Sequence, residues 1–249
     1  MALKLFNLDV QPDEGYTMMV YGGRATGKTH LLGDMLREEA KQGKVLYVNI
    51  AGEDGMKTIK NIGLGNVGVE ATEFNDLEDL IAKLTKEPVH AIAIDSLRAV
   101  AKLANRRITG SDRAPIVEPK GRNEWGELHT LMESTCIRLR HVAKYVVLAC
   151  PADKSVAELD LADKAKADHI APDLPGKEAV QSAGWFDFVG RLEIKSVRPQ
   201  VFARTFNMVP DNVNIVRQRV PSMIKEPIVI PDGQGGWVAI KTKISEAMK

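Results

Sequence analysis

The sequence is poor in cysteine, in net charge and in long apolar runs. Its two cysteines, Cys136 and Cys150, are too few for a disulfide framework, and each lies in an apolar stretch where we expect a reduced, buried side chain. The formal net charge is +1, so a nucleic-acid or membrane partner would have to recognise a local patch. No apolar run approaches the roughly 18 residues that a membrane span needs, and residues 1–16 lack the apolar core of a secretory signal. We therefore expect a cytoplasmic protein without a membrane partner.

Short runs rich in valine and isoleucine alternate with longer segments of helical periodicity. The runs occupy residues 16–22, 44–52, 89–96 and 145–151, and the helical patterns occupy residues 28–42, 54–62, 75–86 and 122–144. Such alternation is typical of an α/β fold with a mostly parallel central sheet flanked by helices. The length suits one sizeable core, so one domain over residues 1–249 is expected.

The pattern changes after Pro151. Residues 151–184 are polar and punctuated by proline and glycine, which predicts a partly mobile excursion. The segments "FDFVGRLEIKSV" and "QVFARTFNMV" then alternate apolar and polar residues around "RPQ", the pattern of a C-terminal antiparallel β-hairpin. Residues 212–220 and 235–241 are expected to add further strands, the latter within a C-terminal extension of residues 220–249.

The segment "GGRATGKT" matches the phosphate-binding pattern G-x-x-x-x-G-K-T, directly after a predicted strand and before a predicted helix. Its glycines let backbone amides face phosphates, and the helix N-terminus adds partial positive charge. Lys28 is expected to reach the β- and γ-phosphates of ATP, and the Thr29 hydroxyl to ligate Mg²⁺. The residues expected around the nucleotide are Gly22, Gly23, Arg24, Ala25, Thr26, Gly27, Lys28, Thr29 and His30.

Acidic residues follow two of the apolar runs. Asp95 ends "AIAIDS", where a carboxylate can hold Mg²⁺ through water and Ser96 can help to orient it; the alternative is an aspartate that only caps the next helix. Glu53 follows the second run and is the candidate catalytic base, with Asp54 as the alternate. An acidic helix start exposed to solvent is the other interpretation of this pair. The sequence thus predicts a Mg-nucleotide site.

The order of these motifs, with the terminal hairpin, resembles the core of RecA-type ATPases. More narrowly, "PDLPGKEAV", "FDFVGRLEIK" and "VRQR" resemble a phage branch of small RecA-like ATPases linked to single-strand annealing and recombination. The resemblance implies ATP hydrolysis in a homo-oligomer, a ring or a filament, with active sites at subunit interfaces. It also implies that Arg217 or Arg219 approaches the γ-phosphate of a neighbouring subunit, with Lys195 and Arg198 in reserve. Exposed arginines that only solvate a sheet edge are the alternative.

The sequence departs from the RecA-like pattern at two places. RecA-like recombinases tend to carry a polar sensor pair after the fourth strand, where this chain has Ala149 and Cys150. Coupling between the γ-phosphate and a DNA-binding loop is therefore expected to depart from the usual pattern, with Asp153 or Lys154 as the candidate substitutes. Glu53 also lies slightly later in its loop than the pattern prefers.

Basic residues gather between the third run and the long helix, where RecA-like proteins have a DNA-facing loop. They can contact phosphates of single-stranded DNA of any sequence, although a solvated loop is the alternative. These residues are Arg106, Arg107, Arg113, Lys120 and Arg122.

The leading hypothesis is therefore a phage ATPase that acts on single-stranded DNA in recombination, annealing or replication. A single-strand binding protein or a replication protein is a further possible partner. One alternative is a nucleotide-dependent loader with a protein partner. The other is a P-loop small-molecule kinase, which the lack of a compact arginine-rich segment disfavours.

Overall fold

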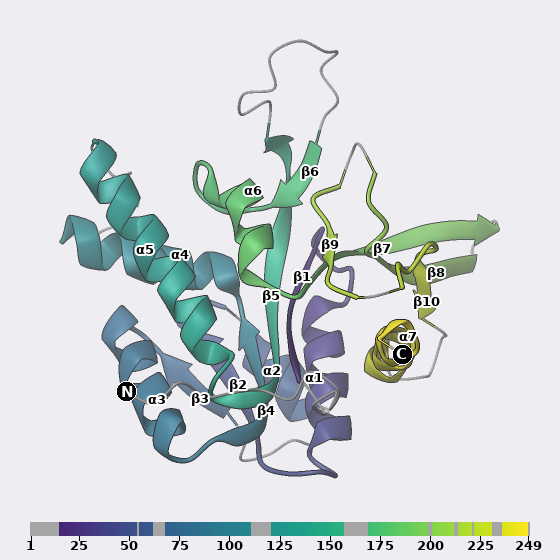
Figure 1. Cartoon of the computed structure of the whole chain (residues 1–249), viewed down its shortest axis with the longest axis horizontal. Helices are drawn as coiled ribbons and strands as arrows, with labels where there is room; N and C mark the ends of the chain where they lie inside the picture. The colour runs from purple at the N-terminus through teal and green to yellow at the C-terminus, as the bar shows by residue number, and fades with distance from the viewer. Residues whose placement is uncertain are drawn as a thin grey trace.

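A mostly parallel β-sheet with helices on both faces forms the centre of the molecule (Figure 1). The computed structural model describes residues 15–53, 55–61, 68–110, 121–156, 169–198, 201–211, 214–220, 222–230 and 236–248. Along its main path the sheet has, in spatial order, the strands β10 (Ile228–Ile230), β8 (Val201–Asn207), β7 (Phe188–Arg198), β1 (Tyr16–Gly22), β5 (Ala143–Val156), β4 (Val89–Asp95), β2 (Val45–Ile50) and β3 (Gly68–Ala71). The α/β class predicted from the alternating pattern is confirmed. Among the residues just given, no helix is long and apolar enough to cross a membrane.

The parallel part of the sheet contains the strands that the apolar runs predicted. These are β1 (Tyr16–Gly22), β2 (Val45–Ile50), β4 (Val89–Asp95) and β5 (Ala143–Val156), with β3 (Gly68–Ala71) added at the edge. Every residue of β1 is buried. A strand that is buried on both faces has an almost continuously apolar sequence, so the apolar runs predicted these strands. Strand β3 was not expected, because the short, half-exposed "GVEA" carries no such run.

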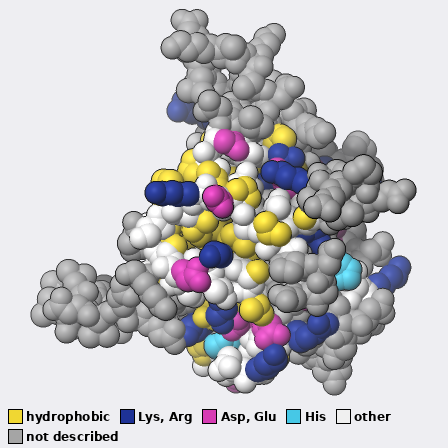
Figure 2. Space-filling view, turned by 90° about the vertical axis from the view of Figure 1, so that its right-hand side faces the viewer, with side chains coloured by type: hydrophobic (Ala, Val, Ile, Leu, Met, Phe, Trp, Pro, Cys, Tyr) yellow, Lys and Arg dark blue, Asp and Glu magenta, His cyan; other side chains and the backbone are white. Residues whose placement is uncertain are grey.

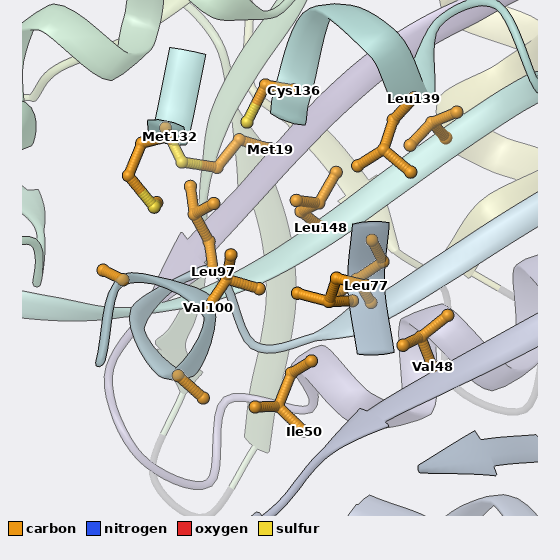
Figure 3. Close-up of a cluster of buried hydrophobic side chains, with 14 of the residues drawn as sticks. Met19, Val48, Ile50, Leu77, Leu97, Val100, Met132, Cys136, Leu139 and Leu148 are labelled. Atoms are coloured by element: carbon orange, nitrogen blue, oxygen red, sulfur yellow. The ribbon is translucent and has the colours of Figure 1, made fainter. Parts of the chain in front are cut away.

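Two layers of helices cover the sheet, one on each face (Figure 1). One face carries α1 (Lys28–Glu39), α2 (Gly55–Asn61) and α7 (Gly236–Ala247). The other carries α3 (Phe74–Lys86), α4 (Leu97–Thr109), α5 (Arg122–Leu139), α6 (Glu178–Gln181) and the short 3₁₀ helix η1 (Ser182–Trp185). On this second face Leu77, Val100 and Leu139 bring three helices into one buried cluster against the strands (Figure 3).

The buried face expected for α5 is confirmed by Leu128, Met132 and Leu139, although the helix ends before residue 144 because Ala143 already belongs to β5. Both cysteines are free and buried, as the sequence predicts. Burial raises the pKa of the Cys136 thiol to about 12, as is typical of a cysteine that serves as a small apolar side chain.

The C-terminal antiparallel hairpin is confirmed. Strand β7 (Phe188–Arg198) runs parallel to β1 and antiparallel to β8 (Val201–Asn207), which pairs with β10 (Ile228–Ile230). The short strand β9 (Arg217–Gln218) also pairs with β7. The hairpin extends past the carboxyl end of β1, because Tyr21 pairs with Arg191 and β7 continues to Arg198. It therefore lies beside whatever the carboxyl end of β1 binds.

The strand expected at residues 235–241 was wrong, because Gly236–Ala247 forms helix α7. The window "GGWVAIK" is too short to distinguish the two-residue period of a strand from the 3.6-residue period of a helix. The longer pattern decides, since Trp237, Ile240 and Ile244 recur at helical spacings of three and four and are all fully buried. They pack in the same cluster as Leu32 of α1.

Ordered elements occupy much of the excursion that was expected over residues 151–184. Strand β5 continues to Val156 and pairs antiparallel with β6 (His169–Pro172). Leu174 and Ala179 are buried where the chain returns to the sheet. The expectation of mobility was therefore wrong for these described parts, and residues 157–168 lie outside the described residues.

Candidate functional site

The "GGRATGKT" loop joins the carboxyl end of β1 to the N-terminus of α1. Gly27 has a φ of 95° in the left-handed region, which glycine adopts without strain and which turns the chain into α1. A Cβ at Gly22 would lie 2.5 Å from the carbonyl oxygen of Leu192, so only glycine fits against β7 there. The glycines of the motif therefore serve two separate needs: a turn at one end and a close strand contact at the other.

Lys28 lies folded over this loop. Its Nζ donates hydrogen bonds to the carbonyl oxygens of Gly22 and Gly23, at 2.8 and 2.7 Å. Burial lowers the pKa of Lys28, and the nearby Asp95 carboxylate opposes that shift. The ammonium group and the N-terminal amides of α1 thus concentrate positive charge in one place, which suits a phosphate chain. His30 is exposed at the start of α1.

Asp95 lies at the carboxyl end of β4, beside the start of α1. Thr29 Oγ1 donates a 2.8 Å hydrogen bond to Asp95 Oδ2, and the hydroxyl of Tyr47 donates one of 3.3 Å to the same oxygen. Burial raises the pKa of Asp95, and the hydrogen bond from Thr29 opposes that shift. The side-chain cap of the next helix comes from Ser96, whose Oγ accepts a hydrogen bond from the Ala99 amide.

The donor set at this point suits Mg²⁺. A threonine hydroxyl and a carboxylate lie in contact next to the phosphate loop, and hard oxygen ligands with phosphate oxygens are what Mg²⁺ prefers. Across the described part of the chain, no cluster of three or more histidine, cysteine or acidic side chains forms a self-sufficient metal site. Thr29 and Asp95 would therefore hold the ion together with the nucleotide.

Glu53 lies just after β2, at the same edge of the sheet. Its Oε1 accepts a 2.9 Å hydrogen bond from Ser96 Oγ, and its carboxylate is close enough to Asp95 to contribute to the raised pKa of that residue. A Cβ at Gly55 would lie 2.0 Å from the Tyr47 hydroxyl oxygen and 2.8 Å from Asp95 Oδ2, so α2 begins directly against this cluster. Asp54 lies outside the described residues.

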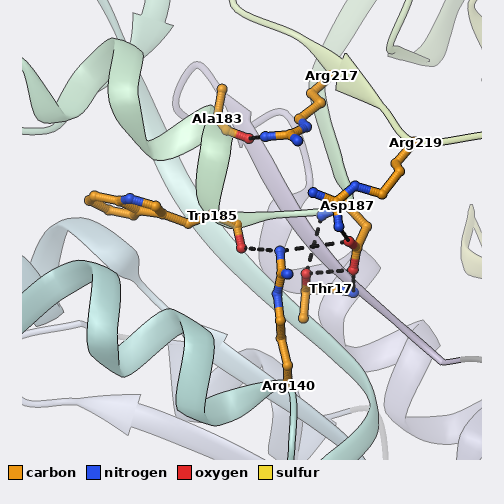
Figure 4. A network of polar contacts seen from close by, with 7 residues as sticks. All are labelled: Thr17, Arg140, Ala183, Trp185, Asp187, Arg217 and Arg219. Carbon is orange, nitrogen blue, oxygen red and sulfur yellow. Dashed lines mark hydrogen bonds and ion pairs between the residues drawn. The ribbon is translucent and has the colours of Figure 1, made fainter. Parts of the chain in front are cut away.

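Arg219 lies toward the amino end of β1, and Arg217 of β9 lies level with the middle of that strand (Figure 4). Arg219 Nη1 forms a 2.9 Å ion pair with Asp187, whose other carboxylate oxygen accepts hydrogen bonds from the amide and hydroxyl of Thr17. Thr17 lies five positions before Gly22 in β1, about 16 Å along the strand. Arg219 is therefore remote from the phosphate loop of its own chain.

The side chains of both arginines have partners within the chain. Arg217 Nη1 donates a 3.0 Å hydrogen bond to the Ala183 carbonyl, and Arg140 bonds the Trp185 carbonyl at 2.6 Å beside Asp187 (Figure 4). Burial lowers the pKa of Arg217, and the neighbouring Arg219 adds to that shift. Their action on a neighbouring subunit stays a prediction.

Three of the five basic residues expected to contact DNA lie where α4 ends and α5 begins, which we call the α4–α5 junction. Arg107 forms an ion pair with Glu78 and lies over the Phe74 ring, 5.4 Å from its centroid. Arg106 precedes it near the end of α4, and Arg122 is exposed at the start of α5. Arg113 and Lys120 lie outside the described residues.

Charges of both signs are mixed on one face of the molecule (Figure 2). On the described part of the face in Figure 2, basic and acidic side chains alternate with apolar ones rather than forming a field of one sign. Lys195, named in reserve for the γ-phosphate, forms an ion pair with Glu193 at 3.2 Å. The α4–α5 junction therefore remains the place where a DNA contact is predicted.

Two residues near the site were missed by the sequence analysis. Tyr47 of β2 reaches Asp95, but a tyrosine within an apolar strand resembles any core aromatic. Arg204 of β8 lies against Gly27 of the phosphate loop: a Cβ at Gly27 would be 3.0 Å from Arg204 Nη1. No local motif indicates this proximity, because it depends on β8 lying two strands from β1 in the sheet.

A family model described as an AAA domain matches residues 14–220, from just before β1 to just after β9. The chain belongs to this AAA-domain family. The crystal structure of the flagellar accessory protein FlaH from Methanocaldococcus jannaschii resembles this AAA domain with a TM-score of 0.51 and 12% sequence identity, over 87% of this chain and 84% of that one. At that identity the likeness shows a shared fold. The comparison with curated proteins finds no match.

The AAA-domain family and the shared α/β fold support a P-loop ATPase. The expected phosphate loop and terminal hairpin both lie within the matched residues of the AAA domain. Nucleotide binding and hydrolysis are thus its general activity, and the cluster around Lys28 and Asp95 is where that activity is expected.

Proposed function

We propose that this AAA domain binds ATP with Mg²⁺, hydrolyses it, and acts as a homo-oligomer on single-stranded DNA. The observation that carries the hydrolytic part is the convergence of Lys28, Thr29, Asp95 and Glu53 at the carboxyl edge of the sheet. Ligands bind at this edge in open α/β sheets. Each of the four side chains has chemistry that suits a phosphate, a divalent cation or a water molecule.

The chain's own residues account for ATP binding. The α1 N-terminus and Lys28 neutralise the β- and γ-phosphates, because oxygens of the phosphate chain replace the carbonyls of Gly22 and Gly23 as partners of the ammonium group. Magnesium, when bound, supplies further positive charge at the phosphate oxygens, and Thr29 and Asp95 would hold it.

Glu53 is the proposed base. It accepts a proton from the water whose oxygen attacks the γ-phosphorus, while the bond from that phosphorus to the bridging oxygen breaks and leaves ADP and phosphate. The hydrogen bond from Ser96 keeps one carboxylate oxygen fixed, so the other is free to contact the water. Lys28 stabilises the charge that spreads over the γ-phosphoryl group as the bond breaks.

Two observations support the oligomer and the DNA partner. Arg219 is remote from its own phosphate loop and Arg217 bonds the Ala183 carbonyl, so we infer that either would stabilise a γ-phosphate in a neighbouring subunit. Arg106 and Arg122 flank the basic segment at the α4–α5 junction, where phosphate contacts would be independent of sequence. The likeness of "PDLPGKEAV" and "FDFVGRLEIK" to a phage branch favours a role in recombination, annealing or replication.

One assay tests this function: ATP turnover with and without single-stranded DNA, together with the mass of the ATP-bound assembly. We expect Mg-dependent turnover that DNA increases and a mass several times that of one chain. Turnover that DNA leaves unchanged, in an assembled protein, would favour the loader with a protein partner. Phosphate transfer to a small acceptor by a monomer would favour the kinase.

A further inference from the structure

Arg204 reaches the phosphate loop from the C-terminal hairpin. In the antiparallel ladder it is paired with Ile194 of β7 on one side and Ile230 of β10 on the other. Because Tyr21 of β1 pairs with Arg191, the Ile194 level lies beyond the last residue of β1. The hairpin therefore places Arg204 beyond the last residue of β1, alongside the phosphate loop.

The contact with the loop is close and specific. A Cβ placed on Gly27 would lie 3.0 Å from Arg204 Nη1 and 3.6 Å from its Cδ, so the guanidinium and the end of its stem lie on the residue that precedes Lys28. On the same side of β8 as Arg204, Phe206 is fully buried in the cluster that includes α1. The strand beneath the guanidinium is thus fixed to the helix that starts at the loop.

The charge of Arg204 has no counterpart within the described residues. No hydrogen bond or ion pair joins its guanidinium to any of them, although Arg191 on the same hairpin bonds both Glu193 and Asn214. A cation beside the N-terminus of α1 and the Lys28 ammonium is electrostatically unfavourable on its own. An anion bound between Arg204, Lys28 and the α1 N-terminus would attract all three positive groups and so offset their mutual repulsion. The two parallel N–H donors of a guanidinium also match phosphate oxygens well.

We propose that Arg204 binds the phosphate chain of the nucleotide on the phosphate loop of its own chain, and so links the β7–β8 hairpin to nucleotide occupancy. This inference rests on the proposed nucleotide binding, and it is separate from any arginine supplied by a neighbouring subunit. With ATP or ADP bound, Arg204 gains the charged partner that it lacks among the described residues. The hairpin is then held to the nucleotide at Arg204, in addition to its packing at Phe206.

The first test compares Arg204→Gln with Arg138→Gln, which removes an arginine of α5 whose ion pair with Glu78 is 4.0 Å long. ADP and ATP, each with Mg²⁺, are titrated into each protein by calorimetry. Loss of a charged hydrogen bond predicts Kd values about 10- to 100-fold higher for Arg204→Gln and unchanged for Arg138→Gln. Arg204→Lys should fall between wild type and Arg204→Gln, because it keeps the charge and loses the fork. Equal affinities in all these proteins would overturn the proposal.

Melting temperatures separate a ligand contact from a structural role. Without nucleotide, Arg204→Gln should melt at or above the wild-type temperature, because it removes a cation from the N-terminus of α1. The rise in melting temperature on adding ADP should shrink, because that rise follows affinity. A lower melting temperature without nucleotide, with the response to ADP intact, would assign a structural role and overturn the proposal.

Hydrogen exchange tests the link to the hairpin. ADP should slow exchange of the β7 and β8 amides in wild type and in Arg138→Gln, and not in Arg204→Gln at saturating ADP. The same protection in all three proteins would refute the link. Lys28→Ala distinguishes a failure of the proposed nucleotide binding from a failure of the Arg204 contact alone. If wild type binds no nucleotide, the proposed function fails; if wild type binds, Lys28→Ala does not, and Arg204→Gln binds as wild type, only this inference fails.

Discussion

Ser96 Oγ donates a 2.9 Å hydrogen bond to Glu53 Oε1, and this bond joins the residues that follow β4 and β2 at the edge where the phosphate loop lies. It fixes the orientation of the carboxylate without neutralising it. Glu53→Gln keeps an oxygen that can accept the same bond, but its amide cannot take up a proton. The substitution should therefore separate ATP binding from ATP hydrolysis.

We expect Glu53→Gln to bind ATP within about twofold of wild type and to lose roughly 10²- to 10⁴-fold in turnover, the range for removal of a general base. Binding by calorimetry and phosphate release measure the two effects. Ser96→Ala should show a smaller loss of turnover, since it frees the carboxylate without removing it. If Asp54→Asn alone reproduces the loss, the base is one residue further along the chain.

Asp95→Asn should raise the Mg²⁺ concentration needed for half-maximal turnover. The amide is a poorer ligand than a carboxylate, although it can still accept the hydrogen bond from Thr29. Magnesium titrations at saturating ATP measure the shift, and ADP affinity without magnesium should stay close to wild type. An unchanged magnesium requirement would remove Asp95 from the metal site.

Arg219→Ala should bind ATP as wild type does and hydrolyse it slowly, because a charge supplied to the neighbouring γ-phosphate acts in the transition state. Mixed with Lys28→Ala subunits, it should regain some activity, since some interfaces then pair an intact loop with an intact arginine. The Arg219–Asp187 pair is half-exposed, so a small loss of stability is expected and melting curves control for it. Full activity of a dilute monomer would contradict the shared site.

Neutralising Arg106, Arg107 and Arg113 together should weaken single-stranded DNA binding for all sequences and flatten its salt dependence. Arg138→Ala is the matched control, because it removes a basic residue of α5 outside the junction. Fluorescence anisotropy at several salt concentrations gives both affinity and slope. If the triple variant keeps the wild-type slope, the α4–α5 junction is not the DNA contact.

Glu39 should make stability fall in acid. Burial alone would raise its pKa, but hydrogen bonds from Lys241, Trp237 and His90 bring the pKa below the ordinary 4.5. A carboxylate whose pKa is lower in the folded state stabilises the protein above the unfolded value, and that contribution is lost as pH falls through the folded value.

Glu39→Gln should therefore lower the free energy of unfolding at neutral pH by roughly 1–3 kcal/mol, the cost of breaking a buried charged hydrogen-bond network. It should also reduce the loss of stability below pH 4.5. Denaturant melts at several pH values measure both effects. Glu38→Gln is the control, because its ion pair with Lys41 lies at the surface. Equal pH profiles for wild type and Glu39→Gln would contradict the assignment.

Local patterns in the sequence predicted the parts of the fold that depend on local chemistry. Three features could be recognised from short stretches of the sequence alone: the glycines before Lys28, the apolar run that ends at Asp95, and the alternation of apolar and polar residues in the hairpin. The position of Arg204 carries none, because its proximity to Gly27 follows from the order β8-β7-β1 in the sheet. The ion pair between Arg219 and Asp187 likewise depends on the pairing of β9 with the start of β7.

The contact of α7 with α1 sets an order for folding during synthesis. Trp237 and Glu39, which are joined by a 2.6 Å hydrogen bond, are 198 positions apart in the chain. At about 5–20 residues per second, a ribosome takes on the order of 10–40 s to cover that distance. During that interval α7 is not yet available to pack against α1, the helix that begins at Lys28. A nascent chain is therefore expected to expose apolar residues of α1 to chaperones until α7 has left the exit tunnel.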